Sequence, residues 1–261
     1  MALPAADDVW RQLDRVTDPE LDEPVTDMGF VESVTVGDDG VVDVAFRLPT
    51  FWCSPNFAYL MAADIRTEIE KLPWVTGVRV KLEDHMFADK VNAGVNEGLP
   101  FGHVFPDEAP DEDLAEIREQ FREKAFRRRQ EAVLRAFRDR GTSDDRIVAL
   151  TLADFDATDT ADDTAARQKA RYRDILRERG LAGKPTDPAF PTYDGGPLDA
   201  ADLGAYLSAL KATRLNMEFS GSLCRALLDV RNKGRDGATG EPELADFMPK
   251  PDTMAQERTR R

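Results

Sequence analysis

The strongest constraint on the fold is an alternation of apolar and polar residues near the start of the chain. The apolar positions are Val42, Val44, Phe46 and Leu48. Since successive side chains of a strand point to opposite faces, this spacing predicts a strand with one buried face. The segment Gly37-Asp38-Asp39-Gly40 precedes it and favours a hairpin turn, because Gly and Asp tolerate positive φ. We therefore expect residues 30–36 to form the partner strand.

A helix is expected directly after this hairpin. Ser54 is a suitable N-cap and Pro55 fits the first helical position. Apolar residues then recur three and four positions apart until Pro73 ends the helix. A short helix at 6–16 precedes the hairpin, and a second alternating segment at 78–82 follows the long helix. The order helix–strand–strand–helix–strand predicts a small α+β sandwich with its helices on one face of the sheet.

The rest of the chain changes character after residue 87. The stretch 88–112 is rich in Gly, Pro, Asn and Asp, so we expect a linker or extension there. Helical patterns dominate 113–233, and the polar residues 234–261 are expected to form a mobile tail. Within the helical part we expect helices at about 113–140, 164–179, 199–211 and 213–233. The fold class is thus α+β, with an α+β domain at 1–87 and a mainly α-helical C-terminal region.

Acidic residues are concentrated in the first part of the chain. The formal net charge is −15, and residues 1–105 carry 19 acidic and 8 basic residues, which accounts for −11 of it. A surface of that sign repels phosphate backbones, so we expect no nucleic-acid partner. It would suit a partner protein with a basic surface, although acidic surfaces also serve solubility alone. No G-x-x-x-x-G-K-[ST] segment occurs, so we expect no nucleotide cofactor.

The cysteine content and the N-terminus indicate the compartment. Two cysteines are too few for a disulfide framework or a four-cysteine zinc site, and free thiols fit a reducing compartment. The start, MALPAADD, lacks the basic and apolar segments of a signal peptide. No apolar run approaches the ~18 residues of a membrane span. We expect a cytoplasmic protein that does not enter the membrane.

Cys53 is the residue with the clearest potential for chemistry. It lies immediately before the helix that Ser54 and Pro55 open. The unpaired N–H groups and the dipole of a helix N-terminus stabilise a thiolate, which could ligate iron or attack a disulfide. The alternative is a buried, inert cysteine, because free cysteines are often buried.

Four motifs occur in order along the first third of the chain. They are Asp18-Pro19-Glu20, Asp27-Met28-Gly29-Phe30-Val31, Leu48-Pro49-Thr50-Phe51-Trp52-Cys53-Ser54-Pro55 and Gly77-Val78-Arg79-Val80. Together with the order of strands and helices, they resemble the iron–sulfur cluster assembly domain family, which includes SufT-like and PaaD-like proteins. The resemblance covers about residues 6–85, and the helical C-terminal half is not recognised.

The resemblance implies a role in assembling iron–sulfur clusters or in maturing an iron-dependent client protein. Some relatives accompany multicomponent oxygenases, so such an oxygenase is a candidate client. Carried over, Cys53 would be the ligand of iron or of a transient cluster. Asp18, Glu20 and Asp27 match acidic positions of the family, although Asp18 and Asp27 could equally cap turns. One thiolate cannot hold a cluster alone, so a cluster would be shared with a client or across a homodimer.

His85 and Cys224 could also have purely structural roles. His85 follows Glu83-Asp84 and is a candidate metal ligand beside Cys53, with a packing role as the alternative. Cys224 is expected to be a core thiol of the last helix. Two histidines and two cysteines leave few nucleophile–base pairs, so we do not expect an enzyme. Besides the maturation factor, a metal-free adaptor or folding aid that uses the same fold to bind a client remains open.

Overall fold

The computed structural model describes residues 6–107 and 114–235. The predicted mobile tail, 234–261, lies outside the described residues from position 236 onward. Among the helices in the two described ranges, none is both long and apolar enough to cross a membrane.

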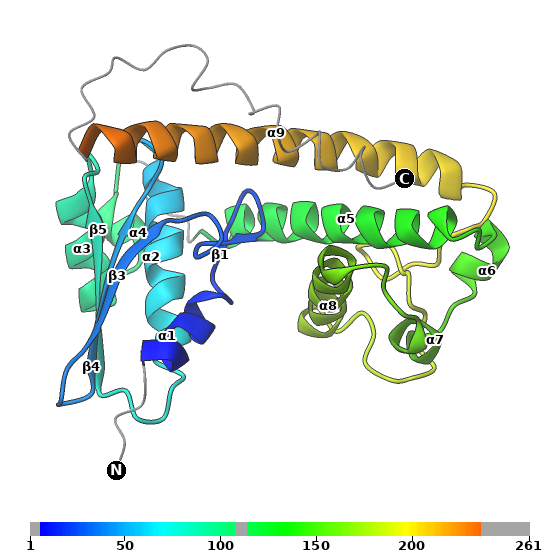
Figure 1. Cartoon of the computed structure of the whole chain (residues 1–261), viewed down its shortest axis with the longest axis horizontal. Helices are drawn as coiled ribbons and strands as arrows, with labels where there is room; N and C mark the ends of the chain where they lie inside the picture. The colour runs from blue at the N-terminus through cyan, green and yellow to red at the C-terminus, as the bar shows by residue number, and fades with distance from the viewer. Residues whose placement is uncertain (1–5, 108–113, 236–261) are drawn as a thin grey trace. The chain divides into compact units, whose positions relative to one another are not determined.

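The chain divides into two compact units (Figure 1). The first unit combines residues 1–118 with 219–261, and the second unit is residues 119–218. The chain passes between the units within two helices, α5 (Ala115–Asp139) and α9 (Leu203–Arg235). Both ends of the chain therefore contribute to the first unit.

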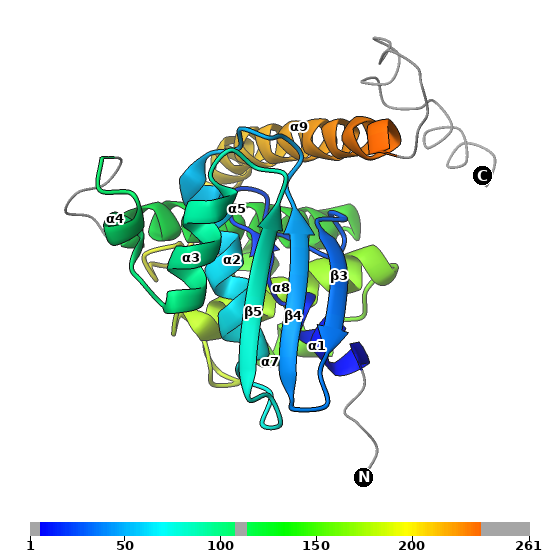
Figure 2. The same ribbon diagram turned by 90° about the vertical axis from the view of Figure 1, so that its left-hand side faces the viewer.

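The first unit contains the predicted sheet. Its strands are β3 (Val31–Val36), β4 (Val41–Arg47) and β5 (Gly77–Glu83), in the order β3-β4-β5. β3 runs antiparallel to β4, as the hairpin turn requires, and β5 runs parallel to β4 (Figure 2). Because parallel neighbours end on the same side, the loops that follow β4 and β5 lie next to each other. The predicted α+β fold is confirmed.

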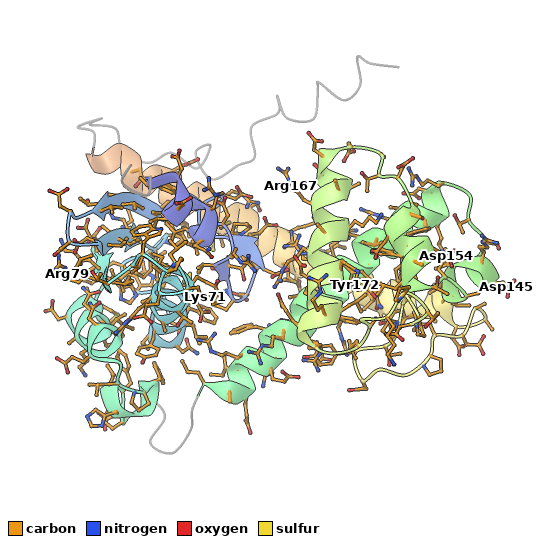
Figure 3. All side chains as sticks on the ribbon, turned by 90° about the horizontal axis from the view of Figure 1, so that it is seen from below. Lys71, Arg79, Asp145, Asp154, Arg167 and Tyr172 are labelled. Atoms are coloured by element: carbon orange, nitrogen blue, oxygen red, sulfur yellow. The ribbon has the colours of Figure 1, made fainter. Side chains whose placement is uncertain are left out.

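Two helices cover one face of this sheet. They are α1 (Ala6–Leu13) and α2 (Pro55–Ile69), seen behind the strands in Figure 2. The fully buried side chains of this layer include Leu13, Phe30, Phe46, Leu60 and Ile65. On the other face, Arg79 (labelled in Figure 3) forms an ion pair with Asp43 of β4. The alternation at 42–48 therefore separates a buried face from a polar one.

The stretch expected as a linker or extension, 88–112, contains helices in its described part, α3 (Ala88–Glu97) and α4 (Phe101–Val104). Two asparagines of α3 bind the edge strand β5. Asn96 accepts from Val80 N–H (2.9 Å) and donates to Val80 O (2.8 Å), and Asn92 does the same with Leu82 (2.7 and 3.1 Å). Four helical residues and two strand residues both advance about 6 Å, so the spacings match. The asparagines that suggested a loop instead cover a sheet edge.

The second unit is helical. Besides parts of α5 and α9 it contains α6 (Asp144–Val148), α7 (Leu152–Ala157) and α8 (Asp163–Glu178). Its aromatic core is formed by Phe126, Phe137, Phe155, Tyr172 and Phe190. Tyr172, labelled on α8 in Figure 3, donates to Ala189 O, and the buried Gln130 donates to both the Tyr172 hydroxyl and Pro191 O. The irregular stretch after α8 is thereby fixed to the helices.

The C-terminal helix differs from expectation in its continuity. Separate helices were expected at about 199–211 and 213–233, but α9 runs uninterrupted from Leu203 to Arg235. The residue between the two expected helices is Ala212, the best helix former, and no proline interrupts the segment. One consequence is that α9 reaches from the second unit into the first.

Candidate functional site

Cys53 lies in the loop between β4 and α2, two residues before Pro55 opens the helix. The residue is partly exposed and does not belong to the buried core. Its Sγ is 3.0 Å from the Thr50 hydroxyl oxygen, with either atom able to donate. A hydroxyl at that distance can donate to a thiolate, which is the reactive form of cysteine.

His85 supports this loop from the end of the neighbouring strand β5. It is buried, and its Nε2 lies 2.9 Å from Cys53 O. Its Nδ1 accepts a hydrogen bond from Phe87 N–H (3.2 Å), so the proton belongs on Nε2, which donates to Cys53 O. Burial lowers the pKa of His85, which favours the neutral ring. Both ring nitrogens have protein partners, so His85 would have to give up a hydrogen bond to ligate a metal.

The motif residue Asp18 organises the turn after α1. It belongs to β1 (Thr17–Asp18), which pairs with β2 (Glu23–Pro24). Its Oδ1 accepts hydrogen bonds from Glu20 N–H and Leu21 N–H, both at 2.9 Å. Burial raises the pKa of Asp18 to about 6. The turn-capping alternative therefore has direct geometric support.

The predicted site residues do not form a ready metal site. Glu20 is partly buried near Asp18, whereas Asp27 is exposed. In residues 6–107 and 114–235, no group of three or more His, Cys, Asp or Glu side chains is arranged to hold a metal ion. The roles assigned to Asp18, Glu20, Asp27, His85 and Cys53 stay predictions.

The C-terminal part of α9, which belongs to the first unit, covers one side of this site. Arg231 donates to Leu48 O (2.6 Å) and binds the Asp84 carboxylate (2.6 Å between Nη2 and Oδ2). Leu48 begins the Cys53 loop, and Asp84 precedes His85. Asp84 has a φ of +51°, which is uncommon for a residue other than glycine. One side chain of α9 thus joins the loops that follow β4 and β5.

Cys224 lies in the part of α9 that belongs to the first unit. It is half-buried on α9 rather than enclosed in a core. Burial raises the pKa of its thiol to about 11, and the next contributions come from the charges of Asp18, Cys53 and Glu20. Helical spacing identifies the face of α9 on which Cys224 lies, but only the tertiary fold shows what that face meets.

Exposed apolar side chains lie in the Cys53 loop and in the loop that follows β5. Phe51, Trp52 and Met86 are 46%, 72% and 51% exposed, and we call these three residues the apolar rim. Met86 N–H donates to Phe51 O (2.8 Å), so the members come from loops that are joined. Large exposed apolar side chains that gather beside a reactive group are typical of a surface that binds another protein.

The fold and the site define a class of protein: a small α+β domain that presents a loop cysteine at the start of a helix, beside an apolar surface. Residues 6–82 match the family model described as iron–sulfur cluster assembly protein. Over 80 residues the chain is 35% identical to the "Fe-S protein maturation auxiliary factor" of Porphyromonas gingivalis. The matched region covers 31% of this chain and 74% of that protein. The chain therefore belongs to the iron–sulfur cluster assembly protein family, and the resemblance seen in its motifs is confirmed. The family match ends before α3 and leaves out α9.

Proposed function

We propose that this chain is an auxiliary factor in the maturation of iron–sulfur proteins or other iron-dependent proteins. In this proposal Cys53 takes up iron or a cluster as cargo and passes it to a client protein. The observation that carries the proposal is the placement of Cys53 in a family domain: partly exposed, beside the Thr50 hydroxyl and just ahead of α2. The name of the relative in Porphyromonas gingivalis supports the same role.

The surroundings of Cys53 suit transfer better than storage. His85 fixes the backbone of the loop through Cys53 O, so the residue is held in place while it remains partly exposed. Clusters usually need four thiolate ligands, so a cargo bound here is completed by ligands from a client or from a second copy of the chain. Incomplete coordination by one partner favours release to the other.

The client is proposed to dock on the apolar rim. Trp52 directly precedes Cys53, so a protein that buries Trp52 brings its own ligands close to the thiol. The negative charge of residues 1–105 favours a client with a basic surface around its docking site. A multicomponent oxygenase, which the family resemblance suggested, is the first client to test. The cytoplasm, where thiols stay reduced, is the proposed location.

The metal-free adaptor remains the second candidate, because the apolar rim alone would serve to bind a client. The two candidates differ in what they require of Cys53. An adaptor needs only the surface, whereas a transfer factor also needs the thiol.

Substitution of Cys53 by Ser separates these candidates. We expect Cys53→Ser to fold normally and bind the client, but to lower the rate of client activation by at least about tenfold, since the hydroxyl is a poor ligand for iron. The measurement is recovery of the client's cluster absorbance or activity after addition of Fe²⁺, sulfide and the purified chain. Ser54→Ala, at the adjacent exposed residue, is the matched control. Full activation by Cys53→Ser would favour the adaptor.

A further inference from the structure

The face of α9 that packs on the first unit is defined by contacts at regular spacing. A Cβ added to Gly221 would lie 3.6 Å from Leu21 Cδ1, and Leu228 Cδ2 lies 3.7 Å from the Cβ position of Gly29. Arg231 binds Leu48 O and Asp84. Positions 221, 228 and 231 are seven and three residues apart, so they share one side of the helix.

Cys224 lies on this same side. It is three residues after Gly221 and four before Leu228, the two spacings that place residues on one helical face. Its neighbour Arg225 donates to Met28 Sδ (3.3 Å), which fixes this turn of α9 against the segment that follows β2. The Cys224 thiol therefore faces the domain, between contacts that flank it on both sides.

The groups that Cys224 faces belong to the candidate site. Arg231 of this face binds Leu48 O, where the Cys53 loop begins, and Asp84, which precedes the His85 that donates to Cys53 O. Leu21, which packs at Gly221, donates its backbone N–H to Asp18. The two thiols thus come from distant parts of the sequence, one inside the family match and one on a helix beyond it. A second thiol on a helix that packs against the loops of the first is more than the family domain alone provides.

We propose that Cys53 and Cys224 together form a two-thiolate site for one thiophilic divalent cation, such as Fe²⁺. This inference rests on the proposed function only in taking Cys53 as the cargo thiol. Binding breaks two S–H bonds and forms two metal–sulfur bonds, both protons pass to solvent, and the metal keeps its oxidation state. Asp18 and Glu20 add negative charge that favours a cation.

Two protein ligands leave the coordination of the cation incomplete. Thiolate sites for divalent metals are usually four-coordinate, so positions remain for water or for ligands of a client. The site would therefore retain a cation until a protein with more ligands takes it.

Cadmium is a suitable probe, because it is thiophilic, is not oxidised or reduced here, and gives an ultraviolet thiolate-to-metal absorption band. The reduced full-length chain is titrated with Cd²⁺ under argon, and each thiol is then mapped by alkylation with N-ethylmaleimide and mass spectrometry. We expect saturation at one equivalent and slower alkylation of both Cys53 and Cys224. Alkylation of Cys224 at an unchanged rate would overturn the proposal, and this test needs no variant.

Two substitutions on α9 give the matched comparison. Cys224→Ser removes the thiol, whereas Leu223→Ser introduces the same residue at an exposed neighbour off the packed face. We expect Cys224→Ser to weaken Cd²⁺ binding at least about tenfold and to reduce the absorption band, and Leu223→Ser to leave both unchanged. Equal binding by Cys224→Ser and the parent chain would overturn the proposal.

The outcome for Cys224 can be told apart from the outcome for the proposed function. If Cys224→Ser binds Cd²⁺ like the parent while Cys53→Ser fails to activate the client, the two-thiolate site is wrong and the maturation role stands. If both thiols bind Cd²⁺ but Cys53→Ser activates the client fully, the site stands and the maturation role fails.

Discussion

The buried carboxyl of Asp18 makes the stability of the fold depend on pH in an unusual direction. Burial raises its pKa from 3.8 to about 6, so between these values the folded state binds more protons than the unfolded state. The free energy of unfolding therefore falls as pH rises through this window and stays lower above it. The ionised carboxylate of Asp18 destabilises the folded state, because burial removes it from water. The hydrogen bonds that it accepts from Glu20 and Leu21 offset this effect only in part.

Asp18→Asn should remove this cost. The amide oxygen can still accept from Glu20 N–H and Leu21 N–H, but the side chain no longer ionises. We expect the variant to be more stable by on the order of 2–3 kcal/mol at pH 7.5 and by about half of that at pH 5. Urea unfolding at both pH values measures the difference, with the exposed Asp27→Asn as control. An equal gain in the free energy of unfolding at the two pH values would contradict a raised pKa for Asp18.

At the level of single residues, the sequence predicts which side chains are candidates for the site. It predicts their hydrogen-bond partners less well. Cys53 was located from the N-cap and proline that follow it, since both signals are local. Its hydrogen bond to Thr50 spans three residues, but the one from His85 spans 32, and the bond from Arg231 of α9 to the loop at Leu48 spans 183. The sequence predicts a core thiol at Cys224, because an apolar helical face does not show which surface it will cover.

Among the elements, α3 shows how composition can mislead. Its Gly and Asn content indicated a loop, yet Asn92 and Asn96 bind the backbone of β5 and Gly94 allows Val104 to approach closely. These reasons for a helix are tertiary, so local propensity could not reveal them. The hairpin, α2 and β5 were predictable because apolar periodicity, the turn residues and Pro55 at the start of α2 all agreed, although the Ser54 side chain makes no capping hydrogen bond.

Asn96→Ala tests whether α3 protects the sheet edge. The substitution leaves the N–H and C=O of Val80 without their partner, so we expect a loss of about 1–3 kcal/mol in the free energy of unfolding. Hydrogen exchange at Val80 N–H should become faster. Glu97→Ala, at the next and exposed position of the same helix, should change neither. Unchanged exchange at Val80 would show that the edge is protected by something else.

We predict that Arg231 limits access to Cys53 by holding α9 in place. Its bonds to Leu48 O and Asp84 hold α9 against the loops around Cys53. We expect Arg231→Gln to increase the rate of Cys53 alkylation about tenfold, because α9 opens more often. Mass spectrometry of the Cys53 peptide after timed iodoacetamide treatment measures this rate. The control variant Asn232→Ala, at an exposed neighbour, should be alkylated at the rate of the parent chain. An unchanged rate in Arg231→Gln would show that Arg231 does not limit access to Cys53.

At the scale of the whole molecule, the first unit is completed by a helix that follows the second unit in sequence. The family match ends at residue 82, yet Arg231 of α9 bonds to both loops of the candidate site, and Cys224 lies on the same helix. A sequence read from its start indicated a domain of 87 residues and a separate helical part. The discontinuous unit could not be predicted, because it depends on where a long helix meets the domain.

Truncation tests this discontinuity. All three tryptophans, Trp10, Trp52 and Trp74, belong to the first unit, so their fluorescence reports its unfolding alone. A chain that ends at residue 218 loses the buried Leu228 and the contacts of Arg231, and we expect the first unit to lose at least about 3 kcal/mol. A chain that ends at residue 235 keeps these contacts and should unfold like the parent in urea. If both truncated chains unfold alike, residues 219–235 are not part of the first unit, and Cys224 then has no structural reason to act with Cys53.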